Sequence, residues 1–408
     1  MLQFILAVTK QKLLFEMKHF IHKILFVLLV LFAGNHIQAQ TPALKSLMNE
    51  IQTIQKRMVP DKRVAILNVS IKDTLNQVIT VEGETNLPEG KEQILQLLKA
   101  SGIQFTDAIR VFPEPSLGEK TWAIATISVA NMRSAPDHAA ELVSQALMGT
   151  PVKVLEANDG WYRIQTPDQY IGWVDSPGIA LKTESELASW KKSRRIVFNR
   201  LSGYAVASPA KNSIHVSDLV LGDLFEMVTE SKSYFQVKFP DGRTAFVKKE
   251  ECISFQEWTE RKPDVKMIIS VARQMLGVPY LWGGTSSKAV DCSGMTKTAH
   301  YAQGIILARD ASQQARYGEH PDFKDIQNLV AGDLLFFGRS AQRVTHVGIC
   351  MGEGRYIHAS GMVRINSIDP KASDYNLSDR KALVAVSRVL NSLNTDGIVL
   401  VKDHPWYN

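Results

Sequence analysis

The feature that most constrains the fold is an internal repeat with a constant offset of 73 residues. Six pairs of residues share this offset, including Trp161 with Tyr234 and Asp168 with Asp241. One offset at six positions implies two copies of a single fold between residues 121 and 252. Each copy has short apolar runs separated by turns such as Asn158-Asp159-Gly160. About 60 residues of short strands predict a small all-β barrel in each copy.

The chain begins with the pattern of an export signal. A basic segment from Met17 to Lys23 precedes the apolar run from Ile24 to Ala33, which has the length of a signal-peptide core. We predict a signal peptide over residues 1–39, with Met17 as an alternative start and an uncleaved anchor helix as the alternative structure. The remaining chain would act in the periplasm or cell envelope, meeting the membrane only transiently during export.

Charge and composition exclude several classes of protein. Hydrophobic residues make up 45% and charged residues 22%, which are ordinary globular values. The net charge falls from +6 to +3 once the four lysines and one glutamate of the predicted signal are removed. No basic cluster remains, so nucleic acid is not an expected partner.

Residues 40–117 predict a small α/β module. Apolar residues recur at helical spacing between Leu44 and Ile54. Residues 64–71, 78–81 and 108–112 have the pattern of strands, and a helix begins at Pro88 and ends at Gly102.

Residues 256–400 differ in character from the repeat. Two helical segments, 265–276 and 291–302, precede strands at 333–337, 344–351, 355–359 and 363–366. This order predicts an α+β domain with an antiparallel sheet. The whole chain is therefore expected to be multidomain: the small module, a first barrel at 121–182, a charged helical connector, a second barrel at 196–254, and the α+β domain.

Three cysteines cannot form a disulfide framework, so at least one thiol stays free. Cys292 lies in the first turn of a predicted helix, directly after Asp291. A helix N-terminus lowers the pKa of a thiol, so Cys292 is a candidate nucleophile. A buried, inert thiol is the alternative for any single cysteine, and we expect it for Cys350.

Two histidines lie on neighbouring predicted strands. A three-residue hairpin loop at Gly352-Glu353-Gly354, with Met351 opposite Arg355, sets Gly348 opposite His358. His346 and His358 then share one face as diagonal neighbours. With Cys292 they form the nucleophile, base and orienting residue of a cysteine hydrolase. The alternative is a zinc site with the same three ligands, although no glutamate is placed as its base.

The residues around these three resemble the NlpC-type cell-wall peptidases, which are papain-like cysteine endopeptidases of murein. The matching stretches are Tyr280-Leu281-Trp282-Gly283-Gly284, Asp291-Cys292-Ser293-Gly294, Gly332–Phe337, His346–Ile349 and Ile357-His358-Ala359. The resemblance implies a papain-like fold over about 265–390, with Cys292 as nucleophile, His346 as base and His358 as the third member. It also implies that Tyr280 supports the oxyanion site, and that Trp282, Asp291 and Ser293 contact substrate.

The order of domains is similar to a subgroup that has two bacterial Src-homology-3-like domains before the peptidase. By that likeness the chain is a γ-D-glutamyl-L-diamino acid endopeptidase acting on murein peptides that begin with free L-Ala. Arg309-Asp310 match an Arg-Asp pair of the subgroup, and Asp310 would bind the substrate's α-amine. Glu141 and Tyr170 of the first barrel would supply a further carboxylate and a phenol, and plain surface exposure is their alternative.

The resemblance implies no cofactor and no metal. Two other functions remain open: a non-catalytic protein that binds murein through its barrels, and a cysteine amidase or acyl hydrolase with another substrate. The sequence does not distinguish diaminopimelate from lysine at the cleaved bond, intact wall from released peptides, or one oligomeric state from another.

Overall fold

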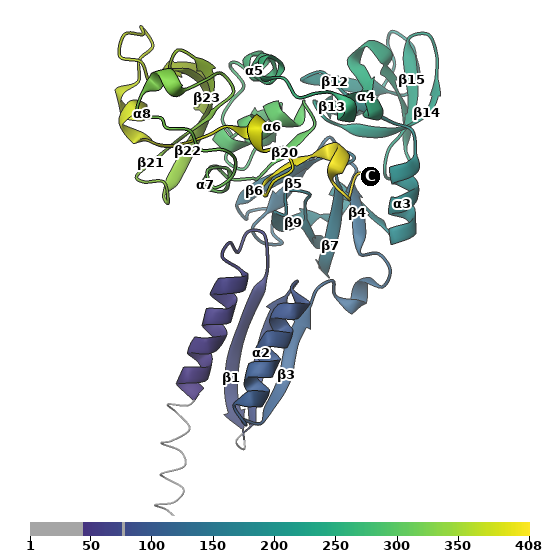
Figure 1. Cartoon of the computed structure of the whole chain (residues 1–408). Coiled ribbons are helices and arrows are strands. Elements are labelled where there is room, and N and C mark those ends of the chain that lie inside the picture. Colours follow the sequence, from purple (N-terminus) through teal and green to yellow (C-terminus); the bar gives the residue numbers. More distant parts are fainter. Residues whose placement is uncertain (1–43, 76–77) are drawn as a thin grey trace, which may run out of the picture. The chain divides into compact units, whose positions relative to one another are not determined.

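The computed structural model describes residues 44–75 and 78–408 (Figure 1). Two compact units divide them: the first ends at Val111, and the second comprises Arg63–Ala65 and Phe112–Asn408. The predicted signal peptide lies outside the described residues. Within the described ranges, no helix is long and apolar enough to cross a membrane.

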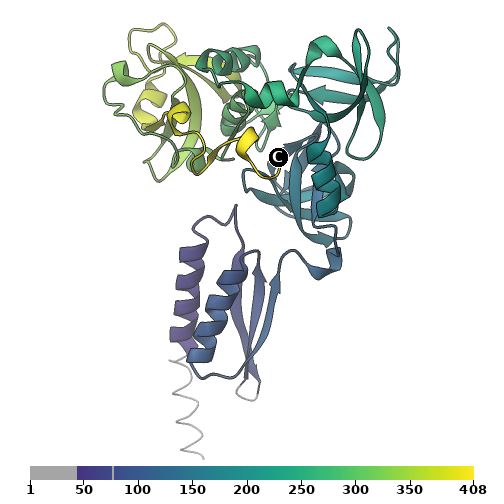
Figure 2. The same cartoon turned by 45° about the vertical axis from the view of Figure 1, so that its right-hand side comes forward.

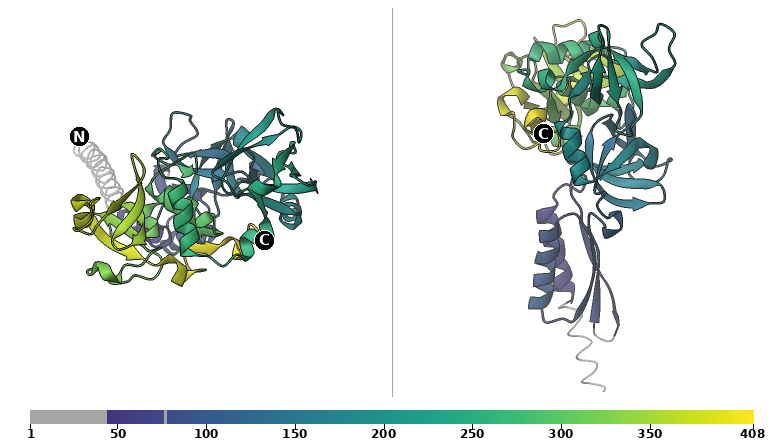
Figure 3. Two further views of the ribbon diagram at one scale, coloured as in Figure 1. Left: turned by 90° about the horizontal axis from the view of Figure 1, so that it is seen from above. Right: turned by 90° about the vertical axis from the view of Figure 1, so that its right-hand side faces the viewer.

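The first unit is a three-stranded sheet. Its helices lie on one face of the sheet (Figures 2 and 3). Strands β1 (Leu67–Leu75) and β2 (Val78–Thr85) are antiparallel, and β2 is parallel to β3 (Phe105–Val111). Helix α2 (Pro88–Ala100) connects the parallel pair, and a further helix covers residues 44–58. The predicted strand at 64–71 begins only at Leu67, because the carbonyls of residues 63 and 64 accept hydrogen bonds from the first barrel.

The two repeats fold into two seven-stranded antiparallel sheets with the same strand order. Every strand of the second copy begins 73 residues after its counterpart in the first. The first copy contains β4 (Trp122–Ala125), β5 (Val129–Arg133), β6 (Leu142–Leu147), β7 (Pro151–Asn158), β8 (Trp161–Gln165), β9 (Ile171–Asp175) and β10 (Ile179–Lys182). The second contains β11 (Arg195–Phe198), β12 (Ser202–Val206), β13 (His215–Val220), β14 (Leu224–Glu230), β15 (Tyr234–Lys238), β16 (Thr244–Lys248) and β17 (Cys252–Ser254).

The predicted connector between the barrels is helix α3 (Glu184–Lys192). Thr183 caps it by accepting a hydrogen bond from the backbone N–H of Glu186, and the Glu186 side chain accepts from the N–H of Thr183. This reciprocal cap satisfies two N–H groups that the helix itself leaves unpaired.

The C-terminal domain is built on a five-stranded antiparallel sheet in the order β24-β23-β22-β21-β25. Apolar residues of one sheet face, including Phe336 and Val347, pack in one buried cluster with Met295 and Ala299 of α6. The strands are β21 (Leu334–Gly338), β22 (Val344–Gly352), β23 (Arg355–Ser360), β24 (Met362–Ser367) and β25 (Leu383–Ser387). The helices are α4 (Phe255–Glu260), α5 (Val265–Gln274), α6 (Cys292–Tyr301), α7 (Ala311–Gln314) and α8 (Leu377–Ala382).

Short elements complete this unit. Two small ladders join β18 (Thr285–Ser286) to β19 (Ala289–Val290) and β20 (Ile305–Leu307) to β26 (Ile398–Leu400). Single turns of 3₁₀ helix lie at Pro115–Leu117, Ser176–Gly178, Lys249–Glu251, Ile326–Asn328, Val389–Ser392 and Val401–Asp403.

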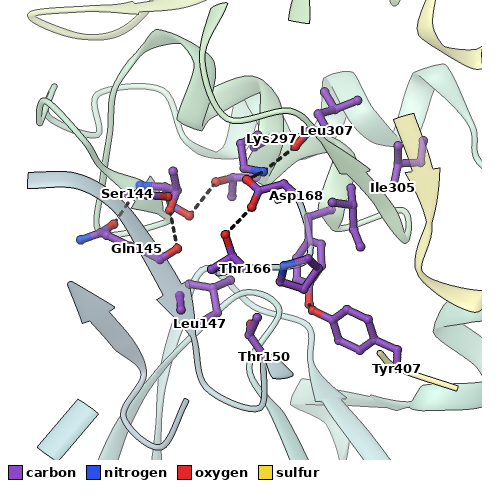
Figure 4. Close-up of a pocket in the computed structure, with 16 residues that line it drawn as sticks. Ser144, Gln145, Leu147, Thr150, Thr166, Asp168, Lys297, Ile305, Leu307 and Tyr407 are labelled. Atoms are coloured by element: carbon purple, nitrogen blue, oxygen red, sulfur yellow. Dashed lines mark hydrogen bonds and ion pairs between the residues drawn. The ribbon is translucent and has the colours of Figure 1, made fainter. Parts of the chain in front are cut away.

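The first barrel is joined to α6, the helix that carries Cys292. Asp168 of the barrel and Lys297 of α6 form an ion pair of 2.7 Å, and their side chains are only 7% and 16% exposed. Figure 4 shows this pair beside a small cavity of about 70 Å³, close to Thr166. Burial alone would raise the pKa of Asp168, but the Lys297 ammonium, the Thr166 hydroxyl and the charge of Arg309 together outweigh burial, and the pKa lies below its usual value. The barrel and the helix are therefore held together by a desolvated charge pair.

The hairpin between the histidine strands differs from the expected one. Arg355 pairs with Gly352, and the register shifts between Cys350 and Gly352. Glu353 and Gly354 form a two-residue turn with positive φ angles of 53° and 72°, which is the backbone of a type I′ turn. The bulge at Met351 restores the phase, so Gly348 still pairs with His358 as predicted.

Candidate active site

Cys292 is the first residue of α6, and Asp291 is its N-cap. The Asp291 carboxylate accepts hydrogen bonds from the backbone N–H groups of Gly294 at 2.7 Å and Gly283 at 3.0 Å. It therefore fixes the helix start to the loop at 280–284. Gly283 has a φ of +80°, and a Cβ there would lie 2.3 Å from the carbonyl oxygen of Leu142 in the first barrel. Only glycine allows the loop to pass this close to the barrel.

Arg309 lies beneath this turn and is 1% exposed. Its guanidinium bonds both oxygens of Asp291 and the hydroxyl of Ser293. A buried arginine with a carboxylate partner in this two-pronged geometry is a rigid support. Arg309, Asp291 and Ser293 were predicted to contact substrate; all three lie at the cleft, and the structure shows them bonded to one another.

The pKa of Cys292 contradicts the expectation from the helix N-terminus. Burial, with the nearby charge of Asp291, raises this pKa to about 12. The backbone N–H groups of Ser293 and Val347 bond the sulfur and favour the thiolate, but they do not outweigh burial. The thiol is protonated at rest and needs a base when it reacts.

His346 and His358 share one sheet face, as predicted. Gly348 pairs with His358, and Nε2 of His346 lies 2.7 Å from Nδ1 of His358. A Cβ on Gly348 would come within 3.1 Å of the His358 Cβ and 2.9 Å of the Tyr356 ring. Glycine at this position therefore leaves the space in which the two imidazoles meet. Because these nitrogens bond each other, they do not converge on a common metal position.

Both histidines are neutral in the resting site. Burial, together with the nearby His358, lowers the pKa of His346 to about 4, although the charges of Asp379 and Asp291 act in the opposite direction. Burial also lowers the pKa of His358. Among the described residues, no hydrogen bond joins the Cys292 sulfur to either histidine, as is common before substrate binds. Val347, whose N–H reaches the sulfur, is the neighbour of His346 and places this strand beside the thiol.

A cleft of about 680 Å³ opens at Cys292. This volume suits a short peptide. Apart from the two histidines, every predicted site residue lines it: Glu141, Tyr170, Tyr280, Trp282, Asp291, Cys292, Ser293, Arg309 and Asp310. The structure thus brings residues of the first barrel and the α+β domain to one cavity.

The exposed ring of Trp282 bridges the barrel and the cleft floor. Its Nε1 donates a 2.6 Å hydrogen bond to the Glu141 carboxylate. Tyr280 is half-buried near Cys292, and burial raises its pKa to about 12, so its hydroxyl remains a donor at neutral pH.

Asp310 has a neighbour that the sequence did not predict. Nη1 of Arg63 lies 2.7 Å from its carboxylate and 3.1 Å from the Ser312 hydroxyl. Tyr170 bonds the same carboxylate, and burial together with this charge raises the Tyr170 pKa. The Arg63 carbonyl accepts a hydrogen bond from the N–H of Ile171 at the start of β9. No local pattern around residue 63 indicates a site, because its partners are more than 100 residues away.

A second hollow of about 610 Å³ lies on the histidine face of the sheet. Thr345 lines both this hollow and the cleft. The residues that line the second hollow include His346, His358, Arg364, Asn366 and Asp379. Asn366 was not predicted as a site residue. Its even spacing from Arg364, which lies opposite His358, places it on the same face and could have indicated it.

Two regions of the chain match known protein families. Residues 277–380 match the NlpC/P60 family, and residues 132–179 match the bacterial dipeptidyl-peptidase Sh3 domain. A γ-D-glutamyl-L-lysine dipeptidyl-peptidase of Bacillus cereus is 27% identical over 57% of this chain and 72% of its own length. Dipeptidyl-peptidase 6 of Lysinibacillus sphaericus is 26% identical over 65% of this chain and 98% of its own.

The fold has a solved counterpart. The crystal structure of an NlpC/P60 family protein from Bacillus cereus superposes with a TM-score of 0.58 at 22% identity. It covers 66% of this chain and 99% of the other. The two chains therefore share a fold over the covered residues.

Proposed function

We propose that this chain, an NlpC/P60 cysteine peptidase with a bacterial Src-homology-3-like domain upstream, cleaves murein peptides after γ-D-glutamate. The bond is the one between γ-D-glutamate and an L-diamino acid, in peptides whose N-terminal L-Ala is free. The carrying observation is the cleft at Cys292, where Glu141 and Tyr170 of the first barrel lie with Asp310. The Bacillus cereus relative, named for γ-D-glutamyl-L-lysine peptides, supports the same substrate class.

A peptidase that releases dipeptides needs a group that reads the substrate's N-terminus. An ammonium group in a shielded cleft requires carboxylate partners, because an unpaired charge is costly to desolvate. Asp310 and Glu141 supply two carboxylates and Tyr170 a phenol. These three residues would hold the N-terminus of the substrate. The distance from them to Cys292 would then determine which peptide bond the Cys292 sulfur attacks.

The Asp310 carboxylate forms an ion pair with the Arg63 guanidinium. The substrate ammonium would replace the Arg63 guanidinium as the ion-pair partner of the Asp310 carboxylate. The two side chains of this pair are 34% and 27% exposed, so the exchange would take place at the open side of the cleft. The ion pair shows that the carboxylate accepts a cation in this position.

The reaction would follow from the geometry of the three residues. Cys292 attacks the γ-glutamyl carbonyl while His346 takes the thiol proton, and a carbon–sulfur bond forms. His346 then gives the proton to the leaving amine of the diamino acid as the carbon–nitrogen bond breaks. Water, deprotonated by His346, hydrolyses the thioester and frees the γ-carboxyl group and the thiol.

Mass spectrometry of the products tests the proposed bond. The purified protein, incubated with L-Ala-γ-D-Glu-L-Lys or the matching diaminopimelate peptide, should release L-Ala-D-Glu and the free diamino acid. The Cys292→Ala variant should release neither. Cleavage at the L-Ala bond, or hydrolysis retained by Cys292→Ala, would contradict the proposal. Binding of murein without any turnover would favour the non-catalytic alternative.

We also propose that the protein is exported to the periplasm or cell envelope, on the basis of the sequence of residues 17–39. N-terminal sequencing of the protein from cell fractions would test this. The expected outcome is an envelope protein that begins close to Gln40. A cytoplasmic protein beginning at Met1 or Met17 would contradict it.

A further inference from the structure

A hydrogen-bonded chain crosses three strands behind Cys292. His346 lies on β22, His358 on β23 and Asn366 on β24, each diagonal to the next on the same sheet face. Nε2 of His346 is 2.7 Å from Nδ1 of His358, and Nε2 of His358 is 3.0 Å from Oδ1 of Asn366. The chain ends where Nδ2 of Asn366 donates to the backbone carbonyl of Asp374 at 3.3 Å.

The hydrogen bond between Asn366 and the Asp374 carbonyl determines which nitrogen carries the proton in each histidine. A carbonyl oxygen only accepts hydrogen bonds, so the Asn366 amide must turn its NH₂ group to Asp374 and its oxygen to His358. His358 therefore carries its proton on Nε2, and its Nδ1 is an acceptor. His346 in turn must donate from Nε2, which leaves Nδ1 as the unprotonated nitrogen.

We propose that Asn366 is a positioning residue that fixes the tautomers of both histidines and so keeps Nδ1 of His346 ready to accept the Cys292 proton. A neutral imidazole with its proton on Nδ1 would have no lone pair for the thiol. Removing the Asn366 oxygen would let the hydrogen bonds between the two histidines reverse their donor-to-acceptor direction. His358 could then donate from Nδ1, and His346 would carry its proton on the wrong nitrogen.

The same chain stabilises the imidazolium that forms during the reaction. When His346 has taken the thiol proton on Nδ1, its Nε2–H still donates to His358, so no bond has to be remade. The other charges facing the pair are Asp379 of α8, Asp291 before α6 and Arg364 of β24; Tyr356 is also close. None of these four is hydrogen-bonded to either ring among the described residues, so Asn366 alone fixes the proton positions.

Three variants separate positioning from folding. Asn366→Asp keeps an acceptor oxygen, Asn366→Leu removes it, and Ser367→Ala is the matched control. Ser367 is the next residue of β24, buried on the other face, where it bonds the Gly354 carbonyl. Its loss perturbs the strand without touching the histidines.

The readouts are ¹⁵N NMR of the histidine rings and the rate at which iodoacetamide alkylates Cys292 at pH 7, located by peptide mapping. The wild type should show both rings protonated on Nε2, assigned by the signals lost in His346→Asn and His358→Asn. Asn366→Leu should populate the other tautomer and slow alkylation on the order of 10-fold. Asn366→Asp should keep wild-type tautomers and alkylate within about twofold of the wild type.

Ser367→Ala should keep both wild-type readouts even if its melting temperature falls. The proposal is overturned if His358 of the wild type is protonated on Nδ1, if Asn366→Leu leaves both readouts unchanged, or if Ser367→Ala slows alkylation equally. No peptide substrate enters these measurements, so they stand even if the proposed bond is wrong.

Discussion

In the first barrel, residues 141 and 170 are a glutamate and a tyrosine that line the cleft at Cys292. At the equivalent positions 73 residues later, the second barrel has Ile214, which is 80% exposed, and Arg243. The strands and their order are the same in both copies. The core positions also agree, since Ile164 and its equivalent Val237 are both fully buried.

The difference shows where a duplicated domain can diverge. Buried positions must keep their apolar volume in both copies, because each barrel needs its own core. Loop and edge positions carry no such constraint and can take up function. The first barrel pairs Asp168 with Lys297 of α6 and places Glu141 and Tyr170 in the cleft.

The largest expected difference concerns Asp168 and its equivalent Asp241. Asp168 pairs with Lys297 in a buried position, whereas Asp241 pairs with Arg243, whose side chain is 40% exposed. Asp168→Asn leaves a buried ammonium without its carboxylate and should lower the free energy of unfolding by about 3 kcal/mol. Asp241→Asn should cost about 0.5 kcal/mol. Urea denaturation measures both, and equal losses would contradict a special role for the first interface.

Variants at Glu141 and at its equivalent, Ile214, test whether only the first barrel contributes to substrate binding. Glu141→Gln removes one carboxylate from the proposed amine site and should raise KM for the free peptide on the order of 10-fold, with little change in kcat. Ile214→Glu, which adds a carboxylate at the equivalent position of the second barrel, should leave both constants unchanged. Steady-state kinetics with L-Ala-γ-D-Glu-L-Lys gives both values. A wild-type KM for Glu141→Gln would remove the first barrel from substrate binding.

The pH dependence of activity should be set by the histidines and not by residues of the first barrel. The base acts unprotonated, and its pKa of about 4 in place of 6.5 keeps it in that form well below neutrality. Because kcat/KM reports the pKa values of the free enzyme, kcat/KM should hold down to roughly pH 5 and fall only as the pH passes through this pKa. Glu141→Gln should show the same acid limb. A limb near pH 6.5 would mean that His346 is more hydrated than its burial indicates.

The smallest effect is expected at Arg63, which bonds Asp310 and would compete with the substrate ammonium in the proposed amine site. Arg63→Gln should lower KM for the free peptide by about two- to fivefold, the size expected for a partly exposed ion pair. Arg57→Gln is the control, since Arg57 bonds Gln93 in the first unit. If KM rises instead, Arg63 contributes to binding rather than competing with it.

Much of this architecture follows from local patterns. The constant offset predicted two like folds. Period-two spacing and the expected hairpin put His346 and His358 on one face, and the bulge at Met351 keeps that register although the turn itself differs. The bulge at Met351 escaped prediction because a type I′ turn and a three-residue loop have similar sequences. The pKa of Cys292 was mispredicted because the helix N-terminus is visible in sequence, whereas burial is a property of the folded chain.

Arg63 and Asn366 were missed for different reasons. Arg63 reaches Asp310 across 247 positions of sequence, and no periodicity links them. Asn366 lies on a predicted strand, but its importance depends on the orientation of one amide relative to the Asp374 carbonyl. Such information exists only once the backbone is placed.

In the proposed function, residues of the first barrel and Asp310 bind the free amine of the substrate at one end of the cleft. The most direct measurement compares kcat/KM for L-Ala-γ-D-Glu-L-Lys with that for the same peptide acetylated on its N-terminal amine, by mass spectrometry of the released lysine. Loss of the charged hydrogen bonds should reduce cleavage of the acetylated peptide on the order of 100-fold. Equal cleavage of both peptides would contradict the amine site formed by Asp310, Glu141 and Tyr170 while leaving the cysteine peptidase in place.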